Sequence, residues 1–358
     1  MHIAKTTPIV FKGKTSEYFG IWIVNVLLSL LTLGIYSAWA KVRKKKYFYN
    51  NAFIENIGFD YHANPVAILK GRIIAFVVFT VYAFSQNTYP AISLVLILIF
   101  FIALPWLVIR ASIFNARNTS HRGLRFNFIG HIREAAWAYF VMPIITLLTL
   151  GLGVPLSSHQ KNKFMVDKHT FGNMPFNMGA TVKQFYKEYF TCSVVVSIAL
   201  FCLAIPLFIL GKDFFQNAHF SLPPIPHATE TPNKFQAMLF VFGAIFLYLL
   251  MILLFTSYLQ AHIGNLVWNS TTLNHLSFKS SLRARDLLWI YVSNLLAIAL
   301  TLGLATPWAQ IRTAQYRASK LELIGDIHFE QFVGHQKADM QAMGEEMADM
   351  FDVDLSFG

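Results

Sequence analysis

Three carboxylates at equivalent positions of three repeated segments are the side chains best placed to do chemistry. Glu17, Glu134 and Asp286 each stand at the start of a long apolar run. Ionisable groups beside membrane helices often mark ion or proton paths, so these acids are candidates for lining a polar pathway. They also lie where a helix would begin, and a carboxylate there stabilises free backbone N–H groups. The sequence favours this second, structural interpretation.

Two amides lie two helical turns deeper in the first and third segments. Asn25 and Asn294 could line the same pathway, but hydrogen bonding between helices is the favoured interpretation. Met142 takes the equivalent place in the middle segment. This substitution argues against any site that needs three equivalent ligands.

Other catalytic signatures are missing from the sequence. The 12 histidines include no HExxH motif, and no paired CxxC, GxxxxGK or GxSxG is present. We therefore predict a protein that is not an enzyme, with no catalytic residue, no metal site and no cofactor.

The acids belong to a pattern that occurs three times without gaps. Each acid is followed fifteen residues later by the triplet Thr-Leu-Gly. Glycine tolerates a left-handed helix C-cap, so each triplet predicts a break between two helices. The threonines and glycines of this break motif are Thr32, Gly34, Thr149, Gly151, Thr301 and Gly303.

Aromatic and basic residues follow the break. A mixture of this kind suits an amphipathic helix at the level of lipid headgroups. The predicted interfacial anchors are Trp39, Lys41, Arg43, Trp308 and Arg312. The chain carries a formal charge of +11, and its cations flank apolar runs, so the predicted partners are anionic membrane lipids. No separate basic domain is present, which disfavours nucleic acid.

The composition is that of a membrane protein. Charged residues make up 13% and hydrophobic residues 55% of the chain, against about one quarter and just under half in soluble domains. Two pairs of apolar runs, within residues 66–114 and 187–262, are long enough to form transmembrane hairpins. Their exits resemble each other at an offset of 150 residues, which pairs Phe128 with Phe278.

These features predict an all-α integral membrane protein that forms a single membrane domain over residues 1–358. Three helix-break-helix units, residues 11–60, 128–177 and 278–330, are joined by the two transmembrane hairpins. Positive charge on both flanks of each unit favours four spans, with the units re-entrant or interfacial. Seven plain spans are the alternative. An acidic tail, residues 334–358, could dock a protein partner or be a solvated terminus.

A family resemblance rests on two stretches. They read FKGKTSEYFGIWIVNVLLSLLTLGIYSAWAKVRKKKYFYNN, from Phe11, and FDYHANPVAILKGRIIA, from Phe59. The chain resembles the YjgN family of bacterial inner membrane proteins, a domain family of unknown function. The resemblance implies the bacterial inner membrane and carries no catalytic residues.

Two functions from different classes remain open. Broken helices that meet near a repeat interface are typical of transporters, so the protein could transport or handle a solute or lipid along a repeat-lined pathway. Alternatively, it is a non-catalytic scaffold that binds anionic lipid and recruits a partner through its tail. Neither substrate nor oligomeric state follows from the sequence.

Overall fold

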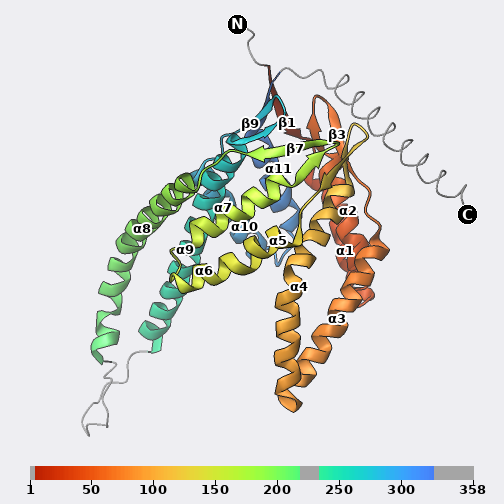
Figure 1. Cartoon of the computed structure of the whole chain (residues 1–358). Coiled ribbons are helices and arrows are strands. Elements are labelled where there is room, and N and C mark those ends of the chain that lie inside the picture. Colours follow the sequence, from red (N-terminus) through yellow and green to blue (C-terminus); the bar gives the residue numbers. More distant parts are fainter. Residues whose placement is uncertain (1–4, 218–233, 326–358) are drawn as a thin grey trace, which may run out of the picture.

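A computed structural model describes residues 5–217 and 234–325. The predicted acidic tail, residues 334–358, lies outside the described residues. Within them, the chain forms five units, each of which contains a pair of antiparallel helices (Figure 1). The pairs are α1 (Thr15–Leu31) with α2 (Ser37–Asn50); α3 (Pro65–Thr88) with α4 (Pro90–Arg117); α5 (Ile132–Ala136), η1 (Trp137–Val141) and α6 (Met142–Leu148) with α7 (Val154–Asp167); α8 (Val182–Asn217) with α9 (Lys234–Asn269); and α10 (Ala284–Leu300) with α11 (Thr306–Ser319).

Short strands connect these pairs. Four β-hairpins share one design: a three-residue strand, a two-residue turn and a five-residue strand. The first strand of the chain pairs with the last. The strands are β1 (Thr6–Phe11), β2 (Ala52–Ile54), β3 (Ile57–Tyr61), β4 (Thr119–His121), β5 (Leu124–Phe128), β6 (His169–Phe171), β7 (Met174–Met178), β8 (Thr271–Leu273), β9 (Leu276–Ser280) and β10 (Leu321–Ile324). They close into an antiparallel barrel in the order β1-β10-β9-β8-β7-β6-β5-β4-β3-β2.

The barrel shows that the all-α prediction was wrong. Its strands are three to six residues long and fall in stretches whose polar composition indicates loops. The missed signal was in the turns, which place residues such as Asn56, Gly123 and Gly172 at positive φ. Left-handed residues at two-residue turns are typical of tight β-hairpins.

The interior of the barrel is an apolar core. The third residue of each five-residue strand, together with Ile9 of β1, points into it. Successive Phe rings lie 6.2 to 6.4 Å apart, centroid to centroid, in the order Phe59, Phe126, Phe176 and Phe278. Leu124, Phe171 and four other buried residues fill the rest.

Four helices are long and apolar enough to cross a membrane. The qualifying segments are Pro65–Gln86, Pro90–Arg117, Val182–Ile205 and Val241–Asn269. They belong to the two predicted hairpins, whose helices extend beyond residues 66–114 and 187–262. The apolar helix α1 is shorter, at 17 residues. The four long apolar helices of the described residues agree with four spans rather than seven.

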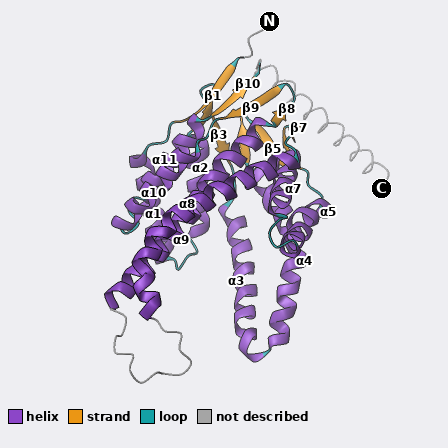
Figure 2. Cartoon of the chain, turned by 90° about the vertical axis from the view of Figure 1, so that its left-hand side faces the viewer, coloured by secondary structure: helices purple, strands orange, loops and turns teal. Residues whose placement is uncertain are grey.

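The helices form a ring below the barrel. Each second helix of a pair packs on the first helix of the next pair, and α11 packs on α1 to close the ring. Figure 2 shows the strands gathered at one end of the molecule and the hairpins α3/α4 and α8/α9 extending from them. Every helix pair therefore begins and ends at the barrel.

Candidate functional site

The Thr-Leu-Gly breaks have the same geometry in all three copies. Left-handed backbone begins one residue before the expected glycine, at Leu33, Leu150 and Leu302, with φ of 49° to 50°. The glycine follows with φ of 90° to 96°. Each threonine hydroxyl donates to the carbonyl four residues earlier, at 2.7 to 2.8 Å, and accepts the N–H four residues later, at 2.9 Å. Threonine thus links the two helices across the break.

The leucines at these breaks are almost fully exposed, at 94% to 95%. The breaks therefore form three apolar tips at the ends of the short hairpins away from the barrel.

The three acids sit at the first turns of their helices, each bound by its own hairpin. Glu17 accepts from the Tyr47 hydroxyl and Asp286 from the equivalent Tyr316 hydroxyl, both at 3.2 Å. Glu134 instead lies 2.6 Å from Lys168 Nζ. These contacts fit the structural interpretation of the acids.

Glu134 is held ionised by its neighbours. Partial burial raises its pKa, but hydrogen bonds from Lys168 and from the His131 N–H outweigh that effect, so the pKa of Glu134 lies below its ordinary value.

The two amides are buried and each meets an arginine of the same hairpin. Asn25 Oδ1 and Asn294 Oδ1 each accept from an arginine Nη1, Arg43 and Arg312 respectively, at 3.4 Å. Asn294 also donates to the Ala309 carbonyl at 3.3 Å. These contacts join the two helices of a hairpin rather than different repeats.

The predicted interfacial anchors divide between packing and exposure. The Trp39 ring stacks on Tyr36, and the Arg312 guanidinium lies 5.0 Å from the Trp308 ring centroid. Lys41 is exposed. The predicted pathway residues do not form one site, since Asp286 lines one cavity and Asn294 another.

Cross-repeat contacts bring together a different set of residues, on the second helix of each pair. Lys45 Nζ on α2 donates to Asn115 Oδ1 on α4 at 2.6 Å. Ser112 on α4 meets Met165 on α7, and Arg317 on α11 donates to Gln260 on α9. We call α2, α4, α7, α9 and α11 the inner ring, because their side chains meet across units.

The inner ring is basic. Lys44, Lys45 and Arg317 have neutral partners in the described part of the chain: the Phe48 and Tyr61 rings, amide oxygens and the Tyr291 hydroxyl. In the described residues of these five helices, the acid is Asp167, the last residue of α7, which pairs with Lys163.

Two grooves open on this inner ring. One, of about 420 Å³, is lined by Lys44 and Phe48 of α2, by α10, and by α11 from Thr306 to Arg317. The other, of about 680 Å³, is lined by α7, α9 and α11 and also includes Arg317. Arg317 therefore belongs to both, and the charged side chains that line the two grooves are Lys44 and Arg317.

Burial lowers the pKa of Lys44, and burial together with the charge of Lys41 lowers the pKa of Lys45. The side chain of Lys44 nevertheless reaches the groove surface. An ammonium that has lost part of its hydration without gaining a carboxylate is stabilised by an incoming anion.

The barrel lies at one end of the inner ring. Its apolar core is interrupted by His121, which takes the place that Ile54, Phe171 and Leu323 take in other strands. Burial first, and then the charge of Arg122, lowers the pKa of His121 to about 4. The imidazole is therefore neutral at neutral pH.

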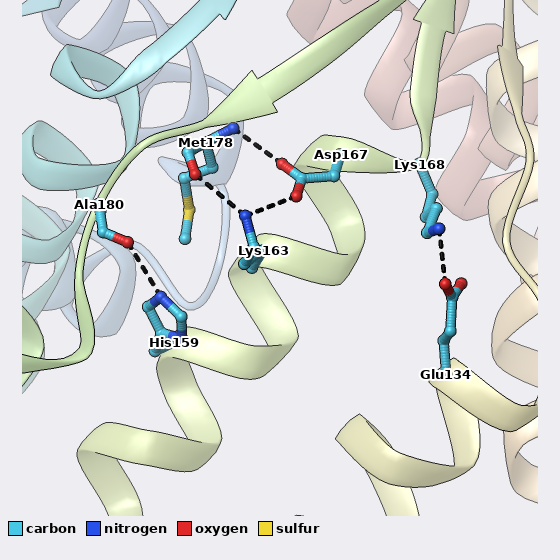
Figure 3. A network of polar contacts seen from close by, with 7 residues as sticks. All are labelled: Glu134, His159, Lys163, Asp167, Lys168, Met178 and Ala180. Carbon is cyan, nitrogen blue, oxygen red and sulfur yellow. Dashed lines mark hydrogen bonds and ion pairs between the residues drawn. The ribbon is translucent and has the colours of Figure 1, made fainter.

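A polar network holds α7 in the ring (Figure 3). Asp167 accepts the Met178 N–H at 2.8 Å, and Lys163 donates to the Met178 carbonyl at 3.3 Å. The buried His159 ring places Nε2 3.0 Å from the Ala180 carbonyl, so this nitrogen carries the proton. Together these contacts fix the end of β7 against α7.

The sequence hypothesis missed the inner ring. Lys44 and Lys45 were visible as part of a basic run, but nothing local connects that run with Arg317. The barrel register brings these helices together. Within the described residues, no group of three or more His, Cys, Asp or Glu side chains could hold a metal ion.

Comparison with known proteins identifies the family of the chain. A family model described as "Bacterial protein of unknown function (DUF898)" matches residues 6–350. The chain belongs to this family. It is 26% identical to the inner membrane protein YjgN of Salmonella typhimurium over 92% of this chain and 91% of the relative. It is 33% identical to YjgN of Escherichia coli K12 over 40% of this chain and 36% of the relative. No solved structure matches.

These relatives and the four apolar helices place the protein in the bacterial inner membrane as a multi-pass protein. The family has no established activity, and no catalytic family is indicated.

Proposed function

We propose that the protein binds an anionic group on its inner ring and handles an anionic lipid or solute in the inner membrane. The observation that carries the proposal is the meeting of Lys44 and Arg317, from opposite ends of the chain, on one groove where their partners are neutral. Lys45, the next residue of α2, also has neutral partners. Guanidinium and ammonium groups of this kind bind phosphate and carboxylate.

A pathway straight through the barrel is disfavoured, because its interior is packed with apolar side chains. The ligand would instead reach the inner ring from the membrane, between hairpins. A lipid headgroup fits this route, and lipid handling is therefore the preferred form of the proposal.

The barrel would face the cytoplasm. Every helix pair returns to it, and basic residues of α2 such as Lys44 and Lys46 lie near that end. Positive charge is concentrated on cytoplasmic segments of inner membrane proteins.

A photo-cross-linking amino acid in place of Ala314, which lines the first groove from α11, would test the binding step. In proteoliposomes we expect it to capture phosphatidylglycerol. The Lys44→Gln, Lys45→Gln, Arg317→Gln triple variant should lose about tenfold or more of the capture, because charge-assisted hydrogen bonds are removed.

The matched control removes charge from the barrel surface instead. Lys5→Gln with Lys279→Gln changes exposed lysines, at 63% and 58% side-chain exposure, and should leave capture unchanged. Excess inorganic phosphate that abolishes capture would identify a soluble anion as the ligand. Equal capture by the triple variant and the control would refute the anion site.

Handling is tested separately from binding. Movement of a fluorescent phosphatidylglycerol between leaflets should be faster in proteoliposomes with the wild-type protein than with the triple variant. If the triple variant loses lipid capture but lipid moves between leaflets equally fast with the variant and the wild type, the protein binds lipid without moving it. The scaffold function, with a partner at residues 334–358, stays a prediction.

A further inference from the structure

A second, independent feature lies away from these two grooves, where two of the short hairpins carry equivalent cavities. One, of about 830 Å³, is lined by α5, η1 and α7 and includes Arg133, Glu134 and Trp137. The other, of about 640 Å³, is lined by α10 and α11 and includes Arg285, Asp286 and Trp289. The three residues occupy the same positions in the two repeats.

Each cavity begins an exposed stripe along its helix. On α10 the stripe runs from Arg285, through Trp289 at 66% exposure and Leu296 at 57%, to Leu300 at 85%. On the middle unit it runs from Arg133 through Trp137, Ile144 and Leu148, which are 49%, 45% and 76% exposed. Spacings of four, seven and four residues keep the stripe on one face of α10. In the middle unit the same spacings cross the π-helix η1, and the stripe is defined there by the exposure of its residues.

The order of chemistry along the stripe matches one leaflet of a bilayer. Fifteen residues of helix span about 22 Å, close to half of a bilayer that is about 40–45 Å thick with its headgroups. Arginine stands at the barrel end, tryptophan one turn deeper and aliphatic residues beyond, as expected for phosphate, interface and acyl chains.

The acids beside the arginines are occupied by other groups. Asp286 accepts from Tyr316, and Glu134 is bound by Lys168 at 2.6 Å. The Arg285 side chain is 86% exposed, and its Nε lies 3.7 Å from Asp286, longer than a hydrogen bond. Arg133 is exposed as well, so both arginines are able to bind a phosphate from outside.

We propose that α10 and the α5–α6 helix each hold one anionic phospholipid, with its phosphate on Arg285 or Arg133, its ester region beside the tryptophan and an acyl chain along the stripe. The first unit provides a natural control. Its helix α1 keeps the apolar half, with Leu27 and Leu31 at 52% and 79% exposure, but carries Ser16 and Gly20 in place of arginine and tryptophan.

Native mass spectrometry of the full-length protein, purified with added phosphatidylglycerol, would count the retained lipids. The experiment uses the Lys44→Gln, Lys45→Gln, Arg317→Gln background, so that the inner-ring proposal cannot contribute. We expect two retained lipids. Arg133→Gln or Arg285→Gln should leave one, and the double variant none.

A gain of binding guards against a loss caused by misfolding. Ser16→Arg with Gly20→Trp rebuilds the motif on α1, where Ser16 is exposed and a side chain at position 20 meets no atom within 4 Å of its Cβ. This variant should retain three lipids. The proposal is overturned if the arginine variants retain as many lipids as their parent, if the α1 variant gains none, or if phosphatidylcholine or excess inorganic phosphate displaces phosphatidylglycerol.

Discussion

The barrel and the inner ring come from the same five units but have opposite chemistry. In the barrel, equivalent positions carry equivalent apolar residues, such as Phe59, Phe126, Phe176 and Phe278, and these fill the interior. In the inner ring, the second helices carry cations at some of the positions that meet, and their partners are neutral. Residues that are alike in the repeated units thus form the core of the barrel, whereas residues that differ between the units form the binding surface of the inner ring.

The largest expected effect concerns the barrel core. Phe171 is 3% exposed, and its ring centroid lies 4.8 Å from that of Phe126. Phe171→Ala should lower the free energy of unfolding by about 3–5 kcal/mol, because it leaves a cavity. Denaturant titration in detergent would measure this, and a loss below 1 kcal/mol would show that the barrel is not the stabilising core.

The second prediction concerns acid. The pKa of His121 is about 4 in the folded protein and near 6.5 when unfolded, so below pH 6.5 the unfolded state takes up a proton that the folded state does not. The stability that the neutral His121 contributes is fully present above pH 6.5 and decreases as the pH falls towards 4. The loss attributable to His121 is about 3 kcal/mol.

His121→Leu isolates this effect. Glu134 also contributes stability that is lost in acid, since its pKa is lowered, so the comparison is between the pH profiles of the variant and the wild type. The variant should lose less stability between pH 6.5 and 4. If the variant and the wild type lose the same stability over this pH range, His121 is not the group that takes up the proton on unfolding.

A smaller effect is expected at the helix starts. The Tyr316 hydroxyl accepts the Arg283 N–H at 3.0 Å and donates to Asp286 at 3.2 Å. Tyr316→Phe should cost about 1 kcal/mol, and Tyr47→Phe a similar amount. The middle unit already has Phe164 at this position. If neither variant loses stability in denaturant titration, the hydroxyl contacts do not hold the acids.

The smallest effect on stability is expected in the inner ring. Lys44→Gln, Lys45→Gln and Arg317→Gln remove cations that have no carboxylate partner in the described residues, so the free energy of unfolding should change by no more than about 0.5 kcal/mol per site. The same titration would measure it. A loss of several kcal/mol would mean that these cations stabilise the fold and would weaken their assignment to ligand binding.

Local patterns predicted local structure well. Apolar length identified the four long helices, and the Thr-Leu-Gly triplets identified the breaks. The barrel was missed because three-residue strands carry almost no periodic signal. The offset of 150 between the two hairpin exits was also wrong. Phe126 and Phe278 are each the third residue of their strand, so Phe126, not Phe128, is equivalent to Phe278.

The candidate site could be predicted only where it is local. The spacing of Glu17 and Asp286 was sufficient to indicate helix starts, and both acids do lie in first turns. The meeting of Lys44 with Arg317 depends on closure of the ring by α11 and α1, which no local pattern of the chain reports.

The pairing of β1 with β10 sets a schedule for biosynthesis. β1 can pair with β2 as soon as both are made, but its other edge waits for residues 321–324, roughly 300 residues later. At about 5–20 residues per second, this edge stays unpaired for at least some fifteen seconds. An unpaired strand edge can pair with another chain. During synthesis, the free edge of β1 in one copy can therefore pair with a strand of a second copy instead of with its own β10.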